Sequence, residues 1–125
     1  MAKILIVDDD ETVRALLTQL MTDAGYEVSS AGNGFQAEEA CNKERFDLMI
    51  IDMVMPGKNG VVTVKEAARK YPSMKIIGIS GGDRSFDGES YLDLVKERGA
   101  HLIFNKPFDG KDLLRAVKGL LEPGA

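Results

Sequence analysis

The 125-residue sequence contains a single cysteine, Cys41, and no long apolar run. One cysteine excludes an intrachain disulfide bond, which fits a reducing compartment. The apolar run that follows the N-terminus, Ile4 to Val7, has only four residues, far fewer than a signal-peptide core or a membrane span requires. We therefore expect a cytoplasmic protein with no membrane segment.

The sequence also lacks a stripe of basic residues, and its formal net charge is −4. Direct binding of nucleic acid needs such a stripe and is therefore not expected. Low-complexity segments and internal repeats are absent as well. A length of 125 residues is that of one ordinary domain. We expect a single domain over residues 1–125, with no output domain in this chain.

Five short apolar runs predict β-strands. Four of them are nearly continuous in Ile, Leu, Val, Met or Phe, which is typical of strands covered on both faces. The run Glu27–Ser30 is more polar and predicts an edge strand. The predicted strands are Lys3–Val7, Glu27–Ser30, Asp47–Ile51, Lys75–Ser80 and His101–Asn105.

Apolar residues at helical spacing fill the gaps between these runs. The clearest stripe begins at Val13 and ends before Gly25, whereas Leu92 and Val95 mark only a weak fourth helix. Asp109 is the expected N-cap of the last helix. Strands that alternate with helices predict an α/β fold, a parallel sheet with helices on both faces.

Polar residues stand at the carboxyl ends of four of the predicted strands. Parallel strands bring their carboxyl ends to one edge of the sheet, where ligands bind. Clustered carboxylates repel one another unless a cation joins them, and Mg²⁺ binds carboxylate oxygens together with phosphate. An aspartate can also act as a nucleophile in phosphoryl transfer, with a lysine and a metal ion stabilising the phosphoryl oxygens. The residues at these ends are Asp8-Asp9-Asp10, Asp52, Ser80-Gly81-Gly82 and Asn105-Lys106-Pro107.

Four segments resemble a bacterial two-component response-regulator receiver domain of the CheY-like superfamily. They are KILIVDDD (3–10), DLMIIDMVMPGKNG (47–60), IIGISGG (76–82) and FNKPF (104–108). Any one of them alone would be weak, but their order and spacing together are specific. The resemblance implies a three-layer (βα)5 flavodoxin-like fold whose five-stranded parallel sheet has the order 2-1-3-4-5.

The resemblance also implies a role for each residue at the strand ends. Asp52 would be the phosphoacceptor. Helix capping, independently of the resemblance, predicts that Asp10 starts the first helix and does not bind metal. Magnesium would be bound by Asp9, Asp52 and the backbone carbonyl of Val54, and through water by Asp8. The phosphoryl group would contact Ser80, Gly81 and Lys106.

The function implied is phosphorelay signal transduction. A sensor histidine kinase or a phosphotransfer protein would donate the phosphoryl group, and the domain would catalyse only its own phosphorylation and dephosphorylation. A protein target would read the face formed by helix 4, strand 5 and helix 5, with the domain acting as a monomer or a weak dimer. The alternative is a Mg²⁺-dependent aspartyl-phosphate phosphohydrolase, but Val54 stands where such an enzyme carries a second aspartate as its proton donor. A flavin- or nucleotide-binding module of the same architecture is disfavoured by the three carboxylates after strand one.

The sequence departs from the family pattern at the position three residues before Lys106. Receivers often carry Tyr, Phe or His there, whereas this chain has Ile103. Either Phe104 or His101 substitutes for the aromatic residue, or the output face works differently. The polar stretch Gly81–Ser90 is expected to be mobile.

Overall fold

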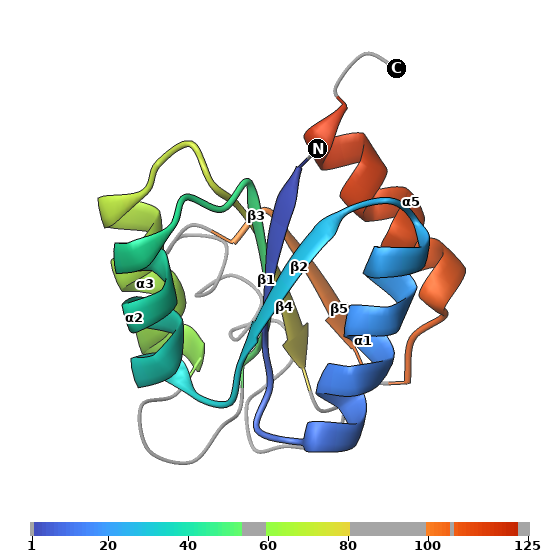
Figure 1. Ribbon diagram of the computed structural model, residues 1–125, viewed down its shortest axis with the longest axis horizontal. Coiled ribbons are helices and arrows are strands. Elements are labelled where there is room, and N and C mark those ends of the chain that lie inside the picture. Colours follow the sequence, from blue (N-terminus) through green and yellow to red (C-terminus); the bar gives the residue numbers. More distant parts are fainter. Residues whose placement is uncertain (1, 54–59, 81–99, 106, 123–125) are drawn as a thin grey trace.

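Five parallel strands form one sheet in the order β2-β1-β3-β4-β5 (Figure 1). The computed structural model describes residues 2–53, 60–80, 100–105 and 107–122. The sheet order and the α/β architecture confirm the predicted fold. The strands are β1 (Lys3–Val7), β2 (Glu27–Ala31), β3 (Leu48–Asp52), β4 (Lys75–Ser80) and β5 (Leu102–Asn105).

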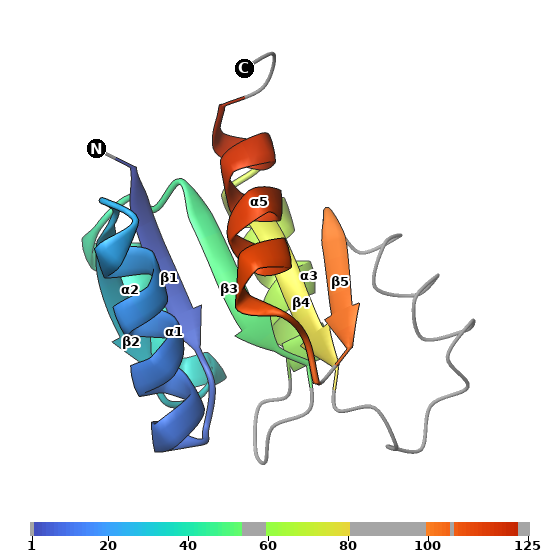
Figure 2. The same cartoon turned by 90° about the vertical axis from the view of Figure 1, so that its right-hand side faces the viewer.

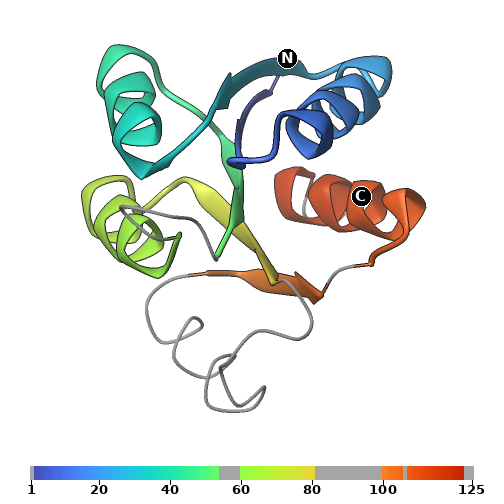
Figure 3. The ribbon, with the colours of Figure 1, turned by 90° about the horizontal axis from the view of Figure 1, so that it is seen from below.

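Helices cover both faces of this sheet. Figure 3 shows α1 and α5 on one face and α2 and α3 on the other. The weak fourth helix predicted around Leu92 and Val95 lies outside the described residues. None of the described helices has the length and apolar content needed to span a bilayer. The helices are α1 (Glu11–Asp23), α2 (Gly34–Lys43), α3 (Gly60–Lys70) and α5 (Gly110–Leu121).

The predicted and observed strands differ by single residues at four strand ends, which belong to three strands. Strand β2 extends by one residue to Ala31, β3 runs from Leu48 to Asp52, and β5 begins after His101. Strand β2 lies at an edge of the sheet, as its polar composition predicted. The shift of β3 matters most, because it makes Asp52 the last residue of the strand.

Alternate residues of the central strands enter two separate cores. Ile4 and Ile6 of β1 pack with the residues beneath α1 and α5, while Leu5 and Val7 pack with those beneath α2 and α3. All four side chains are almost completely buried. Each such aliphatic side chain contributes about 1.5–3 kcal/mol when it is removed from water, so β1 is fixed from both faces.

Short-range capping sets where the helices begin and end. Asp10 is the N-cap of α1, and its carboxylate accepts the backbone N–H groups of Thr12 and Val13 at 2.9 and 3.3 Å. Asp109 caps α5 in the same manner. Gly25 follows α1 with a φ of +98°, a backbone conformation that glycine adopts without steric cost. The predicted positions of Asp10 and Asp109 at helix starts and of Gly25 at a helix end are confirmed.

The stability of the sheet should depend on the protonation of His101. The Nδ1 of His101 accepts the backbone N–H of Ile76 at 3.0 Å, and the backbone N–H of His101 donates to the Ile76 carbonyl at 2.7 Å. Partial burial, and next the positive charge of Lys75, lower the pKa of His101 below its ordinary value of 6.5. The unfolded chain therefore binds the proton more readily than the folded chain. The free energy of unfolding should be highest above pH 6.5 and fall as the pH drops toward the lowered pKa.

Urea unfolding at a series of pH values between 5 and 8 would measure this dependence. His101 is the only histidine in the sequence, so few other groups titrate in this range. The matched control is His101→Asn, because an amide oxygen can accept the same N–H without titrating. An equal slope of stability against pH in both proteins would refute the role of His101.

Candidate functional site

The register of the sheet brings Asp8 and Asp52 to adjacent positions. Strands β1 and β3 pair in parallel with Val7 beside Ile51, so the next residue of each chain lies at the same edge of the sheet. Figure 2 shows the arrowheads of the strands at this common edge, here called the carboxyl edge. Asp8 and Asp52 are 1% and 6% exposed, so both carboxylates are buried where their strands end.

Asp9 completes a group of three carboxylates. Oxygen atoms of Asp8, Asp9 and Asp52 all lie within 4.8 Å of one another, and Asp9 is exposed. Two ionised carboxylates at this separation repel each other by about 3 kcal/mol at the effective dielectric constant of a protein. A bound cation would offset that repulsion, and hard divalent cations prefer oxygen ligands. The predicted convergence of these three residues is confirmed.

The three consecutive aspartates have different surroundings. Asp8 is buried, and its Oδ1 accepts the backbone N–H of Asp10 at 2.8 Å. Asp10 uses its own carboxylate to cap α1, so the group that a metal ion would bind is already engaged by the helix N-terminus. The N-terminus of α1 carries partial positive charge and stabilises carboxylates near it. The acidic triplet therefore contains one helix cap and two residues whose carboxylates lie near that of Asp52.

Gly60, the first residue of α3, packs directly against the backbone of Asp52 and Met53. A Cβ atom added at Gly60 would lie 2.5 Å from the Cα of Met53 and 2.9 Å from its carbonyl carbon, and nearer still to the Asp52 carbonyl oxygen. Only glycine allows α3 to approach the end of β3 this closely. The role of Gly60 was not predicted from the sequence, although this residue ends one of the family-like segments.

The other predicted site residues are described only in part. Asp52 pairs with Ile79 of β4, and Ser80 is the next residue of that strand, paired with Asn105. The Ser80 backbone therefore lies at the carboxyl edge one position beyond the neighbour of Asp52. Three predicted site residues lie outside the described part of the chain, namely Val54, Gly81 and Lys106, and so does the side chain of Ser80. The stretch Gly81–Ser90, which was expected to be mobile, also lies outside it.

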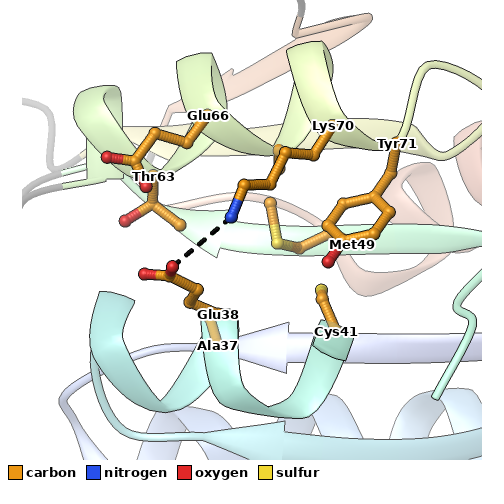
Figure 4. A pocket seen from close by; sticks show the side chains of 9 residues that line it. Ala37, Glu38, Cys41, Met49, Thr63, Glu66, Lys70 and Tyr71 are labelled. Atoms are coloured by element: carbon orange, nitrogen blue, oxygen red, sulfur yellow. Dashed lines mark ion pairs between the residues drawn. The ribbon is translucent and has the colours of Figure 1, made fainter. Parts of the chain in front are cut away.

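A small hollow between α2 and α3 is a second candidate site (Figure 4). Its lining includes Cys41, Met49 and Tyr71, and the ion pair of Glu38 with Lys70, 3.5 Å between nitrogen and oxygen, spans it. The cavity volume of about 20 Å³ holds little more than one water molecule. Burial raises the pKa of the Cys41 thiol, which disfavours the nucleophilic thiolate. The cluster of Asp8, Asp9 and Asp52 at the carboxyl edge is therefore the better candidate for the functional site.

Comparison with known proteins identifies the family. The family model of the response regulator receiver domain matches residues 4–118. The chain belongs to this family. The resemblance found in the four sequence segments is confirmed.

Individual relatives agree with this assignment. The receiver domain is 38% identical over 122 residues to the sporulation initiation phosphotransferase F of Bacillus subtilis, covering 95% of this chain and 93% of the relative. A CheY-like receiver domain protein from Methanospirillum hungatei has a TM-score of 0.89 at 29% identity, covering 98% and 94% of the two chains. The response regulator TrrA of Thermotoga maritima, solved with Mg²⁺ and BeF, has a TM-score of 0.85 at 32% identity, covering 97% and 100%.

The receiver domain places Ile103 and Phe104 on opposite faces of β5. Ile103 packs with the core beneath α2 and α3, and Gly78 of β4 leaves room for it, because a Cβ there would lie 3.0 Å from the Ile103 Cδ1. Phe104 packs with the other core and meets Phe108 edge to face, with ring centroids 6.2 Å apart. His101 precedes the start of β5. Neither Phe104 nor His101 occupies the position of Ile103.

Proposed function

We propose that Asp52 accepts a phosphoryl group in a Mg²⁺-dependent reaction and that this modification switches a face read by a partner protein. The observation that carries the proposal is the buried carboxylate of Asp52 with oxygens of Asp8 and Asp9 within 4.8 Å. A carboxylate nucleophile and a cation site thus share one edge of the sheet. This arrangement suits formation of an aspartyl phosphate.

Two relatives support this chemistry. The Bacillus subtilis relative is named a phosphotransferase, and the structure of TrrA contains Mg²⁺ and BeF. Both relatives are at least 30% identical to this chain and are covered over more than 90% of their length. A similar reaction on the equivalent carboxylate is the simplest function for this receiver domain.

The reaction requires little covalent chemistry from the protein. An Asp52 carboxylate oxygen attacks the phosphorus atom of a phosphohistidine, the P–N bond breaks, and the leaving imidazole takes up a proton. The product is an acyl phosphate on Asp52. Most of the barrier is lowered by positioning and by charge stabilisation. Strand β3 supplies positioning, because Asp52 pairs with Ile79 of β4 and the next backbone N–H, that of Met53, donates to the Ile79 carbonyl at 2.8 Å.

The residues at the carboxyl edge would hold the magnesium ion. Asp9 and Asp52 would bind it through carboxylate oxygens and Asp8 through water, with the Val54 carbonyl as a further ligand expected from the family. When bound, the ion would neutralise the phosphoryl oxygens as negative charge moves onto them. We further propose that Ser80, Gly81 and Lys106 contact the phosphoryl group.

The proposed partners are proteins. A sensor histidine kinase or a phosphotransfer protein would donate the phosphoryl group, and a downstream protein would bind a face that includes β5 and α5. The added charge is a local change, and two conformations of nearly equal free energy would convert it into a change of surface. The domain would catalyse only its own phosphorylation and dephosphorylation.

Incubation with acetyl phosphate and Mg²⁺, followed by intact-mass measurement, tests the proposal. We expect one phosphoryl adduct per chain, and we expect EDTA to prevent its formation. Release of inorganic phosphate should not exceed slow hydrolysis of this adduct. Rapid multiple-turnover release of phosphate would instead indicate an aspartyl-phosphate phosphohydrolase.

Asp9→Asn should weaken Mg²⁺ binding and slow adduct formation without changing the acceptor. The substitution removes one charge from the cation site but leaves Asp52 in place. We expect the dissociation constant for Mg²⁺ to rise about 10-fold to 100-fold, the range typical when a metal site loses a supporting group. Titration of Mg²⁺ followed by backbone amide NMR shifts measures it. An unchanged dissociation constant would exclude Asp9 as a ligand.

A further inference from the structure

Arg14 makes a contact that the proposed reaction does not yet explain. This residue lies on the first turn of α1, and its Nη1 donates a hydrogen bond to the backbone carbonyl of Asp8 at 2.8 Å. The Asp8 N–H donates to the Ala31 carbonyl of β2 at 3.1 Å, and the Asp8 Oδ1 accepts the N–H of Asp10. Both backbone polar groups of Asp8 and one carboxylate oxygen are thereby fixed by three different segments.

The same guanidinium group lies against the loop between β2 and α2. A Cβ added at Gly32 would be 3.4 Å from Arg14 Nη1 and 3.3 Å from Gln36 Oε1. The Gly32 N–H donates to that Gln36 oxygen at 2.7 Å, which holds the loop against α2. Arg14 therefore sits between two loops at the carboxyl edge, in a place where glycine permits its close approach.

The position of Arg14 is unfavourable for a basic residue unless it serves another purpose. A positive charge near a helix N-terminus opposes the helix dipole, at a cost of about 0.3–1 kcal/mol. Within residues 2–53, 60–80, 100–105 and 107–122, Arg14 forms no ion pair that would compensate for this cost. Its guanidinium instead donates to the Asp8 carbonyl, and Asp8 is one of the three clustered aspartates.

We infer that Arg14 is a positioning residue for the cation site, an inference that rests on the proposed function of that site. By holding the Asp8 carbonyl, Arg14 fixes the turn from β1 into α1, from which the Asp8 and Asp9 carboxylates reach toward Asp52. A donor that fixes a ligand residue in advance reduces the ordering that metal binding must otherwise impose.

The charge of Arg14 and its hydrogen bond should act on metal affinity in opposite directions. The positive guanidinium repels a cation, so loss of charge alone should tighten Mg²⁺ binding. Loss of the hydrogen bond should weaken binding, because the turn at residues 8–10 is no longer held. The sign of the change therefore separates a positioning role from a purely electrostatic one.

The experiment compares the Mg²⁺ dissociation constants of folded, unphosphorylated Arg14→Met, Arg14→Lys and the wild-type protein, measured by amide NMR shifts. We expect Arg14→Met to bind Mg²⁺ about 10-fold more weakly. Arg14→Lys should recover most of the affinity, because an ammonium group can donate to a single carbonyl oxygen. Arg115→Met is the matched control, since Arg115 is an exposed arginine of α5 paired with Asp112 at 3.5 Å.

A second measurement applies to the metal-free protein. Hydrogen exchange at the Asp10 amide, which donates to Asp8 Oδ1, should accelerate in Arg14→Met and not in Arg115→Met. Exchange at Ile50 in the middle of β3 should stay unchanged, which excludes general destabilisation as the cause.

Three outcomes would overturn the inference. The first is unchanged or tighter Mg²⁺ binding in Arg14→Met, which would show that Arg14 does not position the ligands. The second is failure of Arg14→Lys to recover the affinity, which would show the same. If Asp9→Asn weakens binding while Arg14→Met does not, the proposed cation site stands and only the role of Arg14 is refuted. The third outcome is normal Mg²⁺ binding in Asp9→Asn as well, which would refute the proposed cation site and the inference that rests on it.

Discussion

Asp52→Asn should abolish the phosphoryl adduct while the domain stays folded. An amide has nearly the shape of a carboxylate, so the packing at the end of β3 is preserved, but a neutral amide oxygen is a poor nucleophile toward phosphorus. The other carboxylates do not replace it, because Asp10 caps α1 and Asp8 is hydrogen-bonded to the Asp10 amide. Intact mass after incubation with acetyl phosphate and Mg²⁺ measures the adduct, and circular dichroism checks the fold.

Asp47→Asn provides the matched control for this experiment. Asp47 precedes the same strand at its opposite end, where its carboxylate accepts the backbone N–H of Lys3 at 2.8 Å. The substitution makes the same chemical change far from the carboxyl edge, and an amide oxygen can still accept that N–H. We expect a full adduct in Asp47→Asn. A stable adduct in Asp52→Asn would move the acceptor to another residue and refute the assignment.

Gly60→Ala should produce the second large effect, on stability and phosphorylation together. The added methyl group would collide with the Asp52 and Met53 backbone, and neither β3 nor α3 can move without disturbing a buried core. We expect a loss of about 2–4 kcal/mol in the free energy of unfolding, at the upper end of the costs of overpacking. Any shift that relieves the collision also moves Asp52. A displacement near 1 Å at a reacting group can slow a reaction about 100-fold.

Gly119→Ala is the control for the stability measurement. Gly119 lies within α5, and a Cβ there would meet nothing within 4 Å. Alanine in an open helix position should stabilise the domain by about 0.5–1 kcal/mol. Urea unfolding of both variants and the rate of adduct formation would test the contrast. If Gly60→Ala matched the wild-type protein in both, α3 would not restrict the position of Asp52.

The isoleucine at position 103 also has a consequence for switching. Its side chain packs beside Met53, the residue that follows Asp52, and both crowd the space above Gly78. An aliphatic side chain in this place offers no ring or polar group to pair with a hydroxyl.

Local sequence patterns determined much of this protein. The period of apolar residues specified the five strands and the four described helices. A strand buried on both faces gives a continuous apolar run, whereas a helix buried on one face gives apolar residues three or four positions apart. Capping residues such as Asp10 and Asp109, and Gly25 after α1, act within a few residues of the chain and were therefore readable. The family-like segments specified which strand ends carry the acidic residues.

The tertiary structure decided which of these residues meet. Asp8 and Asp52 are neighbours because β3 pairs with β1 in one register, and a slip of one residue would turn one carboxylate to the other face of the sheet. The contacts of Gly60 with Asp52 and of Arg14 with Asp8 likewise depend on how helices pack on the sheet. Spacing along the chain specifies on which face of a strand or helix a residue lies. Which distant segments come into contact depends on tertiary packing, and no local sequence pattern specifies that packing.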